Sequence, residues 1–291
     1  MSFEFCHIAP TPHLNLVEGR PVHLCLAHLV EQDPSYVNFY LEQKEKHKCT
    51  IILDNSAFEM YKQNRPMYPS DKLISMGQQI KADYLVMSDY PGEKGEKTIE
   101  SAKKLAPEFH DAGFKTFFVP QSEIGDIKDL VEGFRWAQYH PELVDYIGVS
   151  ILGAPNAYGV EKNNKLQRFC SRLRLMYEMK ETMIFKGYRA QGQKVHFLGL
   201  VDGPNELMFM NPFEDYIDTW DSSSAVWAGL NGIEYDKTPT GLIDGKFELE
   251  VDFDFETTDN GKIELAKKNM EWIDRLGLAY LWGKVEANYR R

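Results

Sequence analysis

Short apolar runs alternate with amphipathic segments along most of this chain, and the alternation constrains the fold more than any other feature. The intervening segments, such as 69–82, have the spacing of helices with one apolar face. The apolar runs are almost continuous in Val, Ile, Leu, Phe and Tyr, as expected of strands buried on both faces. The pattern predicts a parallel sheet with crossover helices. The expected strands are 22–29, 49–54, 83–89, 114–121, 144–151, 194–201 and 215–221.

Two arrangements accommodate such a sheet, an open doubly wound sheet and a closed barrel. No GxGxxG sequence follows the first expected strand, which removes the commonest reason for the open sheet. The length of 291 residues suits a TIM-like (β/α)8 barrel. We find no linker and no internal repeat, so residues 1–291 are expected to form a single barrel domain. The position of the eighth strand is not evident.

The style of the sequence changes after Asp221. Residues 245–255 (GKFELEVDFDF) alternate strictly between apolar and polar side chains, which predicts an antiparallel ribbon. Residues 257–281 then show apolar side chains at helical spacing. We expect this segment to be a helix that closes the domain.

Composition excludes several classes of protein. The chain has no apolar run long enough to span a membrane, and its N-terminus lacks the pattern of a signal peptide. Its four cysteines are far apart and form no CxxC pair, as expected of reduced thiols in a cytoplasm. We therefore expect a cytoplasmic protein with no membrane partner, no structural disulfide, no metal and no cofactor.

The net charge of −11 argues against a general attraction to nucleic acid. One segment, 161–194, departs from this average with nine basic and three acidic residues. It is either a solvated helix face or a local phosphate-binding patch. In the second interpretation the residues that contact the backbone are Lys162, Lys165 and Arg168.

Polar side chains stand where the expected strands end. In a barrel these ends form the catalytic rim. Each such residue has a simpler explanation as a helix cap or a turn residue. Several carboxylates at one rim are costly unless chemistry uses them. The residues are Asp54, Asp89, Gln121, Ser150 and Asp221.

Taken in order, these motifs resemble the guanine transglycosylases, which exchange guanine in nucleic acid for a 7-deazaguanine. The matching segments cover roughly residues 50–232, and the ordered set is more specific than any one of them. They are DNSAF (54–58), LVMSD ending at Asp89, VPQ ending at Gln121, IGVSILG (147–153), HFLGLVDGPNEL (196–207) and IDTWDSSSAVWAGLNG (217–232).

Two departures narrow the resemblance. DNSAF replaces a double glycine of the tRNA enzymes, and Phe58 stands where a tyrosine is more usual. The tRNA enzymes also carry a Cys/His zinc site after the nucleophile strand, whereas this chain has no Cys or His after Asp221. The chain is therefore most similar to the compact, zinc-free phage-type enzymes that act on DNA. This similarity favours DNA over tRNA as partner, and the host cytoplasm as location if the protein is encoded by a phage.

The resemblance assigns roles that the chemistry of base exchange supports. Asp221 is the expected nucleophile at the sugar C1′, and Asp54 the general acid/base. Asp89 can accept from the N1–H and 2-amino groups of guanine, while the Gln121 amide donates to O6. Phe58 offers a face for stacking. The other expected substrate-binding residues are Asn55, Gly148, Val149, Ser150 and Leu198, and the co-substrate is a free 7-deazaguanine base.

Several alternatives remain open. The same carboxylates can serve an N-glycoside or nucleoside hydrolase, in which water replaces the incoming base. A tRNA-guanine transglycosylase and a non-catalytic nucleic-acid-binding barrel are two more. Metal-dependent hydrolysis would need His23, His28 or His196 near the carboxylates, although a histidine within an apolar strand is more often a satisfied core residue.

Overall fold

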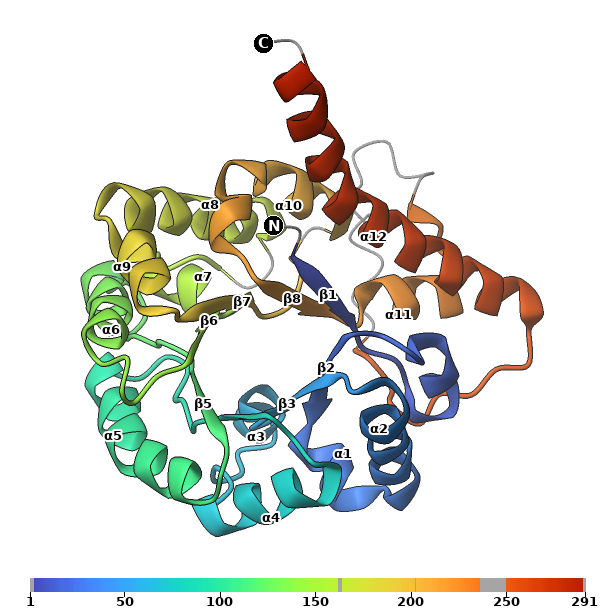
Figure 1. The fold of residues 1–291 in the computed structure, drawn as a ribbon, viewed down its shortest axis with the longest axis horizontal. Coiled ribbons are helices and arrows are strands. Elements are labelled where there is room, and N and C mark those ends of the chain that lie inside the picture. The colour runs from blue at the N-terminus through green and yellow to red at the C-terminus, as the bar shows by residue number, and fades with distance from the viewer. Residues whose placement is uncertain (1–2, 162–163, 202, 236–249, 290–291) are drawn as a thin grey trace.

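The chain folds into a barrel of eight parallel strands surrounded by helices (Figure 1). This computed structural model describes residues 3–161, 164–201, 203–235 and 250–289. The strand order is β1-β8-β7-β6-β5-β4-β3-β2, which confirms the expected TIM-like (β/α)8 barrel. The strands are β1 (Glu4–His7), β2 (Val22–Leu26), β3 (Thr50–Asp54), β4 (Tyr84–Val86), β5 (Lys115–Phe118), β6 (Tyr146–Val149), β7 (Lys194–Phe197) and β8 (Thr219–Ser222).

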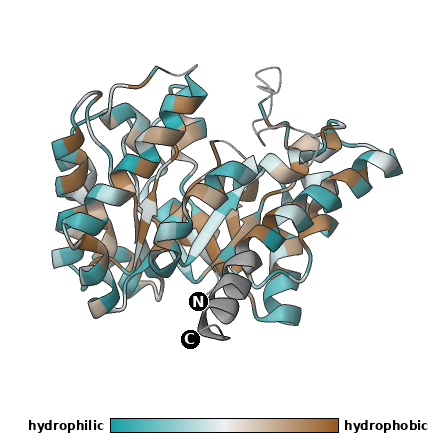
Figure 2. Cartoon of the chain, turned by 90° about the horizontal axis from the view of Figure 1, so that it is seen from above, coloured by the Kyte–Doolittle hydropathy of each residue, from teal (hydrophilic) through white to brown (hydrophobic). Residues whose placement is uncertain are grey.

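Helices cover the outside of the barrel, and Figure 2 shows that apolar and polar residues alternate along them. Their buried residues are mainly the apolar ones, as in α4 and α5. None of the described helices is long and apolar enough to cross a membrane. The helices are α1 (Ala27–Gln32), α2 (Pro34–His47), α3 (Ala57–Lys62), α4 (Ser70–Ile80), α5 (Gly95–Asp111), α6 (Ile127–Tyr139), α7 (Gly153–Ala157), α8 (Lys165–Glu181), α9 (Ile184–Gln191), α10 (Gly203–Phe209), α11 (Ser224–Leu230) and α12 (Asn260–Tyr289), with two 3-10 helices, η1 (Thr11–Val17) and η2 (Asn211–Tyr216).

The strand that the sequence did not reveal is β1, at the N-terminus. It pairs with β8, and Cys6 lies opposite Asp221 in the ladder. β1 and β2 lie side by side, but the described residues form no ladder between them, so the barrel is nearly closed. Only four residues long, β1 is too short to give a clear periodicity of its own.

Aromatic side chains fill the middle of the barrel. Phe117 of β5 stacks on Tyr146 of β6 with ring centroids 5.1 Å apart, and Tyr84 of β4 meets Tyr146 edge-on at 5.1 Å. His196 of β7 packs edge-on against Phe117 at 5.4 Å. These rings form a solid floor beneath the carboxyl ends of the strands, in the layered manner usual for small barrels.

The C-terminal region agrees with expectation in part. The expected closing helix is present as α12, which packs on α11, α10 and β1. Residues 236–249, which include part of the expected antiparallel ribbon, lie outside the described residues. The expectation of a ribbon is wrong for residues 250–255, which are described and contain no strand.

The aromatic side chains of this segment instead pack on residues that follow β2 and β8. The Phe253 carbonyl accepts a hydrogen bond from the Thr11 amide at 2.8 Å, and its ring meets His28 edge-on at 5.7 Å. Phe255 meets Trp227 edge-on at 5.3 Å. Because Thr11 and His28 follow β1 and β2, the segment crosses the rim formed by the strands' carboxyl ends.

The contact between α11 and α12 is close enough to be tested by adding one methyl group. A Cβ on Gly229 would lie 2.2 Å from the Ala266 Cα, which is backbone and cannot move aside. We expect Gly229→Ala to lower the free energy of unfolding by about 1–3 kcal/mol through overpacking. Gly261→Ala, at the exposed start of α12, is the matched control and should change it by less than about 1 kcal/mol. Equal effects in urea denaturation would contradict this packing.

Candidate active site

Four polar residues expected from the sequence do meet at one end of the barrel. Asp54 ends β3, Asp89 and Gln121 follow β4 and β5, and Asp221 lies in β8. Asp89 is hydrogen-bonded to Gln121, and the charges of Asp89 and Asp221 both raise the pKa of Asp54. The parallel order explains this convergence, since every strand ends at the same rim.

Asp89 is held between two side-chain amides. Its Oδ1 accepts from the Asn55 Nδ2 at 2.8 Å, and its Oδ2 accepts from the Gln121 Nε2 at 2.6 Å. Asn55 also donates to the Met87 carbonyl at 2.8 Å, which fixes its orientation. We call Asn55, Asp89 and Gln121 the amide clamp. All three side chains are buried.

One atom of the amide clamp has no hydrogen-bond partner. The Gln121 Oε1 is buried and accepts no hydrogen bond from the described residues. Leaving a buried acceptor unpaired costs about 1–3 kcal/mol, so native proteins rarely do so without a reason. A bound molecule with an N–H group would satisfy it.

Burial raises the pKa of Asp89 to about 6, although the hydrogen bonds from Asn55 and Gln121 work in the opposite direction. At neutral pH the clamp therefore presents an anion whose two oxygens each retain a lone pair. Such a group accepts hydrogen bonds from a ligand that carries adjacent donors.

Asp54 stands in a different environment. Its Oδ2 accepts from the Ser56 amide at 2.9 Å, across a turn in which Ser56 adopts a left-handed φ of 55°. The Ser56 hydroxyl is held in turn by the His28 amide at 3.2 Å and the His28 Nδ1 at 2.9 Å. Burial, followed by the charges of Glu59, Asp89 and Asp221, raises the pKa of Asp54 well above its usual range. A carboxyl of this kind retains a proton that it can donate.

Glu59 belongs to the site, and the sequence analysis missed it. It lies in the first turn of α3, five positions after Asp54. Burial raises its pKa, and the nearby charge of Asp221 adds to the effect. An acidic residue one helical turn beyond a strand-end aspartate was the available signal, but such residues are also common as helix-start charges.

Two nitrogens lie within hydrogen-bond distance of a single oxygen of Asp221. Its Oδ1 lies 2.8 Å from the His196 Nε2 and 3.3 Å from the Gly199 amide nitrogen. The neighbouring aspartate Asp218 does not lie in the site. It precedes β8, where both its oxygens accept from Arg189 at 2.9 and 2.7 Å and one accepts from the Val195 amide at 2.8 Å.

Arg172 of α8, on the outer side of the barrel, fixes the ends of β6 and β7. Its guanidinium donates to the carbonyls of Gly199 at 2.9 Å and Val149 at 3.3 Å, and forms an ion pair with Glu206 at 3.0 Å. Both charged side chains are fully buried. Arg172 belongs to the basic segment 161–194, but its side chain is fully buried, so it supports the rim and does not contribute to a surface patch for phosphate.

The remaining expected residues of β6 and β7 lie beside this support. A Cβ on Gly148 would meet Phe117 at 2.6 Å and Leu198 at 3.0 Å, so glycine is required by the packing of the barrel interior. The Val149 carbonyl accepts from the Leu198 amide at 3.1 Å. The Ser150 hydroxyl accepts from the Leu152 amide at 3.1 Å.

Three of the residues expected to contact the base or the nucleic-acid backbone are at least partly exposed. Phe58 in α3 is 40% exposed, with the Lys62 ammonium 4.2 Å from its ring centroid, so its face is accessible but already paired with a cation. Lys165 begins α8 and Arg168 lies one turn later. Lys162 lies outside the described residues.

The histidines considered as metal ligands separate into different places. His196 contacts Asp221, whereas His23 packs edge-on against Tyr40 of α2 at 5.3 Å and His28 bonds to Ser56. No group of three or more His, Cys, Asp or Glu side chains in the described part of the chain is arranged to hold a metal ion.

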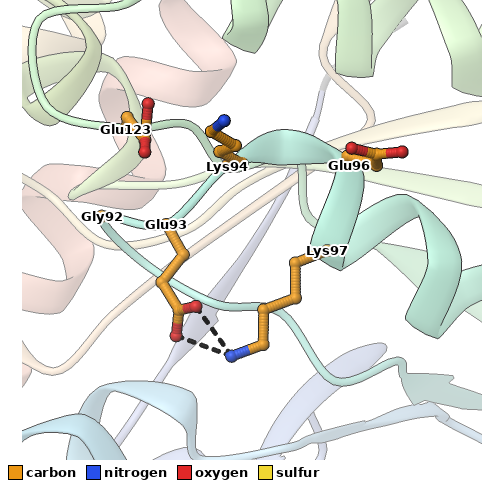
Figure 3. A pocket seen from close by; sticks show the side chains of 6 residues that line it. All are labelled: Gly92, Glu93, Lys94, Glu96, Lys97 and Glu123. Carbon is orange, nitrogen blue, oxygen red and sulfur yellow. Dashed lines mark hydrogen bonds and ion pairs between the residues drawn. The ribbon is translucent and has the colours of Figure 1, made fainter.

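A shallow hollow lies beside the site on the loops that follow β4 and β5 (Figure 3). It carries acidic side chains and two lysines, and Lys97 is ion-paired with Glu93 at 2.7 Å. Its five charged side chains are all exposed to solvent, unlike the carboxylates of the amide clamp and of Asp221. The hollow is lined by Gly92, Glu93, Lys94, Glu96, Lys97 and Glu123.

No protein-family model matches the chain, and no curated protein matches it at a significant level. The fold and the side chains at the rim therefore carry the functional argument.

The raised pKa of Asp89 predicts how stability depends on pH. Because the folded protein holds the proton more tightly than the unfolded chain, the stabilising effect is complete below about pH 4 and is lost as the pH rises through about 6. The free energy of unfolding of the wild type, minus that of Asp89→Asn, should fall over this range by up to about 3 kcal/mol.

Glu31→Gln provides a control of opposite sign. Hydrogen bonds from Lys72 and Tyr68 lower the pKa of Glu31, so its contribution is lost as the pH falls. The corresponding difference for this variant should rise with pH. Urea denaturation at several pH values measures both, and a flat difference for Asp89→Asn would show that Asp89 titrates normally.

Proposed function

We propose that this protein is a base-exchange transglycosylase that replaces guanine in nucleic acid with a 7-deazaguanine through a covalent aspartyl-sugar intermediate. The observation that supports this most strongly is the difference among three carboxyls at one rim. Asp221 receives N–H donors on one oxygen, Asp54 has a strongly raised pKa, and Asp89 is held by two amides. A nucleophile, a general acid and a base-reading group require these three environments.

In the first half of the proposed reaction, Asp221 attacks the sugar C1′ through an oxocarbenium-like transition state. The bond between C1′ and the guanine N9 breaks, and its electron pair stays on N9. Asp54 donates its proton to the departing base. The negative charge of Glu59 favours this role because it helps to keep Asp54 protonated before the reaction.

The second half reverses these steps with a different base. The N9–H of the incoming 7-deazaguanine gives its proton to the Asp54 carboxylate as N9 attacks C1′. The bond between Asp221 and C1′ breaks, and the aspartate leaves with the electron pair. Because the sugar–phosphate backbone is never cut, the polymer emerges intact.

The amide clamp suits the edge of guanine that carries donors. The N1–H and 2-amino groups are adjacent donors, and the available acceptors are the Asp89 oxygens and the unpaired Gln121 Oε1. The sequence-based expectation gave Gln121 a donor role toward O6. In the folded chain one Nε2 hydrogen is engaged by Asp89, so Gln121 can offer both its remaining N–H and its unpaired carbonyl.

The preference for DNA as the polymer rests on the resemblance to the compact phage-type enzymes and on the lack of Cys and His after Asp221. tRNA and free nucleosides are the competing substrates. A hydrolase would use the same carboxylates with water as the acceptor of the sugar.

The covalent intermediate provides the most direct test. Mixing the protein with duplex DNA, single-stranded DNA or tRNA and running a denaturing gel should reveal a protein band shifted by the attached polymer, with DNA the most effective. We expect Asp221→Ala to abolish the shift because it removes the attacking oxygen. Supplying labelled guanine should then transfer label into the same polymer.

Asp218→Ala is the matched control, since it removes an aspartate three positions away that pairs with Arg189. It should retain the shifted band. Release of free guanine without incorporation of labelled base would identify a hydrolase. A shift that survives in Asp221→Ala would overturn the assignment of the nucleophile.

The basic patch makes a separate prediction about binding. Changing Lys162, Lys165 and Arg168 together to alanine should weaken DNA binding at every sequence alike. It should also flatten the dependence of log K on log salt by up to about three units, one for each lost phosphate contact. Exchange at saturating DNA should change little, because these groups position the polymer and do not touch the base.

A charge-matched control is offered by Lys46, Lys81 and Lys115, which lie at the opposite end of the barrel, near the start of the strands. Alanine at these three positions should leave the salt slope unchanged. Equal slopes for both triple variants, measured by fluorescence anisotropy, would favour the interpretation of 161–194 as a solvated helix face.

A further inference from the structure

A chain of hydrogen bonds runs through the barrel interior to Asp221. The Tyr146 hydroxyl lies 2.6 Å from the Thr219 Oγ1, which lies 2.5 Å from the His196 Nδ1. The His196 Nε2 lies 2.8 Å from the Asp221 Oδ1. These residues belong to β6, β7 and β8, and each is at most 6% exposed. The chain therefore links the aromatic floor of the barrel to the rim without contact with solvent along its length.

The direction of every hydrogen bond in this chain follows from the chemistry of its ends. An ionised Asp221 can only accept, so the His196 Nε2 must carry a proton. In a neutral imidazole the Nδ1 is then an acceptor, which requires the Thr219 hydroxyl to donate to it. The Tyr146 hydroxyl in turn donates to Thr219. Burial raises the pKa of Tyr146, so this phenol retains its proton and remains a donor.

A doubly protonated, positively charged His196 does not fit the same chain of hydrogen bonds. Its Nδ1–H would donate to Thr219, and the hydroxyls of Thr219 and Tyr146 would then face each other with only one hydrogen bond possible between them. One of the two hydroxyl protons would be left without an acceptor, since Tyr146 hydrogen-bonds only to Thr219 within the described residues. A buried unpaired donor is costly. The chain therefore favours a neutral His196 with its proton on Nε2.

This arrangement makes the two oxygens of Asp221 unequal. Oδ1 lies against the His196 Nε2–H and, at 3.3 Å, the Gly199 N–H. No donor from the described residues reaches Oδ2. The lone pairs of Oδ2 are thus the more available for attack, and the rotation of the carboxylate is fixed by the bonds to Oδ1.

We propose that His196 is a positioning residue that holds the Asp221 carboxylate by Oδ1 and aims Oδ2 at the sugar C1′, an inference that rests on the proposed function. In the covalent intermediate the new bond is Oδ2–C1′, and Oδ1 becomes the ester carbonyl oxygen. When the incoming base displaces the aspartate, negative charge returns to both oxygens. The His196 and Gly199 N–H groups stabilise that charge on Oδ1.

A merely structural histidine would behave differently. It would contribute to stability, but its loss would not change the rate of adduct formation per folded molecule. The distinguishing measurements are the split between kcat and KM, and rescue by a side chain that restores the N–H alone. His196→Leu removes the donor at similar size, whereas the amide of Gln can place an N–H near the position of Nε2.

The experiment measures, on the full chain, kcat and KM for incorporation of labelled guanine into DNA, together with single-turnover formation of the protein–DNA adduct. We expect His196→Leu to lower kcat by about 10²-fold, as a misaimed reactive group does, with KM for the polymer unchanged because His196 does not touch it. His196→Gln should recover at least about 10-fold of that loss through the restored N–H. The control His23→Gln changes another buried strand histidine, one that packs on Tyr40, and should react like the wild type.

A second measurement does not depend on substrate. Nitrogen-15 NMR of the wild-type histidine rings, with the His196 signal assigned by its absence in His196→Gln, reports which ring nitrogen carries the proton. We expect the Nε2–H form. Protonation on Nδ1, or on both nitrogens at neutral pH, would overturn the inference.

The kinetic outcomes separate the two proposals. Wild-type kcat in His196→Leu, or a His196→Gln variant as inactive as Asp221→Ala, would overturn the role of His196 while leaving the transglycosylase in place. Absence of any adduct with DNA or tRNA in the wild type would instead overturn the proposed function, and the inference with it.

Discussion

Like charges gathered at one end of a barrel are the constraint on which the rest of this site depends. Parallel pairing brings the ends of β3, β4 and β8 to one rim, and with them come Asp54, Asp89 and Asp221, joined by Glu59 from α3. Carboxylates in a poorly solvated site repel one another strongly. Each must therefore be compensated, and the protein compensates each in a different way.

These different environments give the three aspartates different chemical properties. Asp89 remains an anion because two amides donate to it, Asp221 receives N–H groups on one oxygen, and Asp54 holds a proton. These solutions are coupled, because the charges on Asp89 and Asp221 are among the causes that keep Asp54 protonated. Removing one charge would change the protonation of its neighbour as well as its own contacts.

The strand ends that form the rim must also stay in place despite the repulsion between these carboxylates. Beneath it, the rings of Phe117, Tyr146 and Tyr84 leave the strands little room to move inward. Behind it, the Arg172–Glu206 ion pair ties together the carbonyls at the ends of β6 and β7. A buried ion pair contributes little net stability, but loss of one partner is strongly destabilising, which suits a role in fixing geometry.

Much of this could be predicted from the sequence, for a physical reason. Strands buried on both faces give long apolar runs, so seven of the eight strands and the rim positions of Asp54, Asp89, Gln121 and Asp221 were evident. β1 was missed because its four residues are too few for a pattern. The contacts of Arg172 and His196 could not be predicted, because charge and residue type do not say which way a side chain points. Only packing decides that Arg172 turns toward the ends of β6 and β7 and that His196 meets Asp221.

The prediction of a strand at 250–255 was wrong for a related reason. The position that this segment occupies instead bears on the proposed chemistry. Alternation predicts a strand only if a partner strand is available, and here the alternate side chains pack on residues that follow β1 and β2. Glu250 also pairs with Lys62 of α3, so the segment spans the side of the rim that carries Asp54. In the proposed exchange, the aspartyl ester must outlast the departure of guanine and await a second base. Restriction of water at this ester is what distinguishes a transferase from a hydrolase built on the same carboxylates.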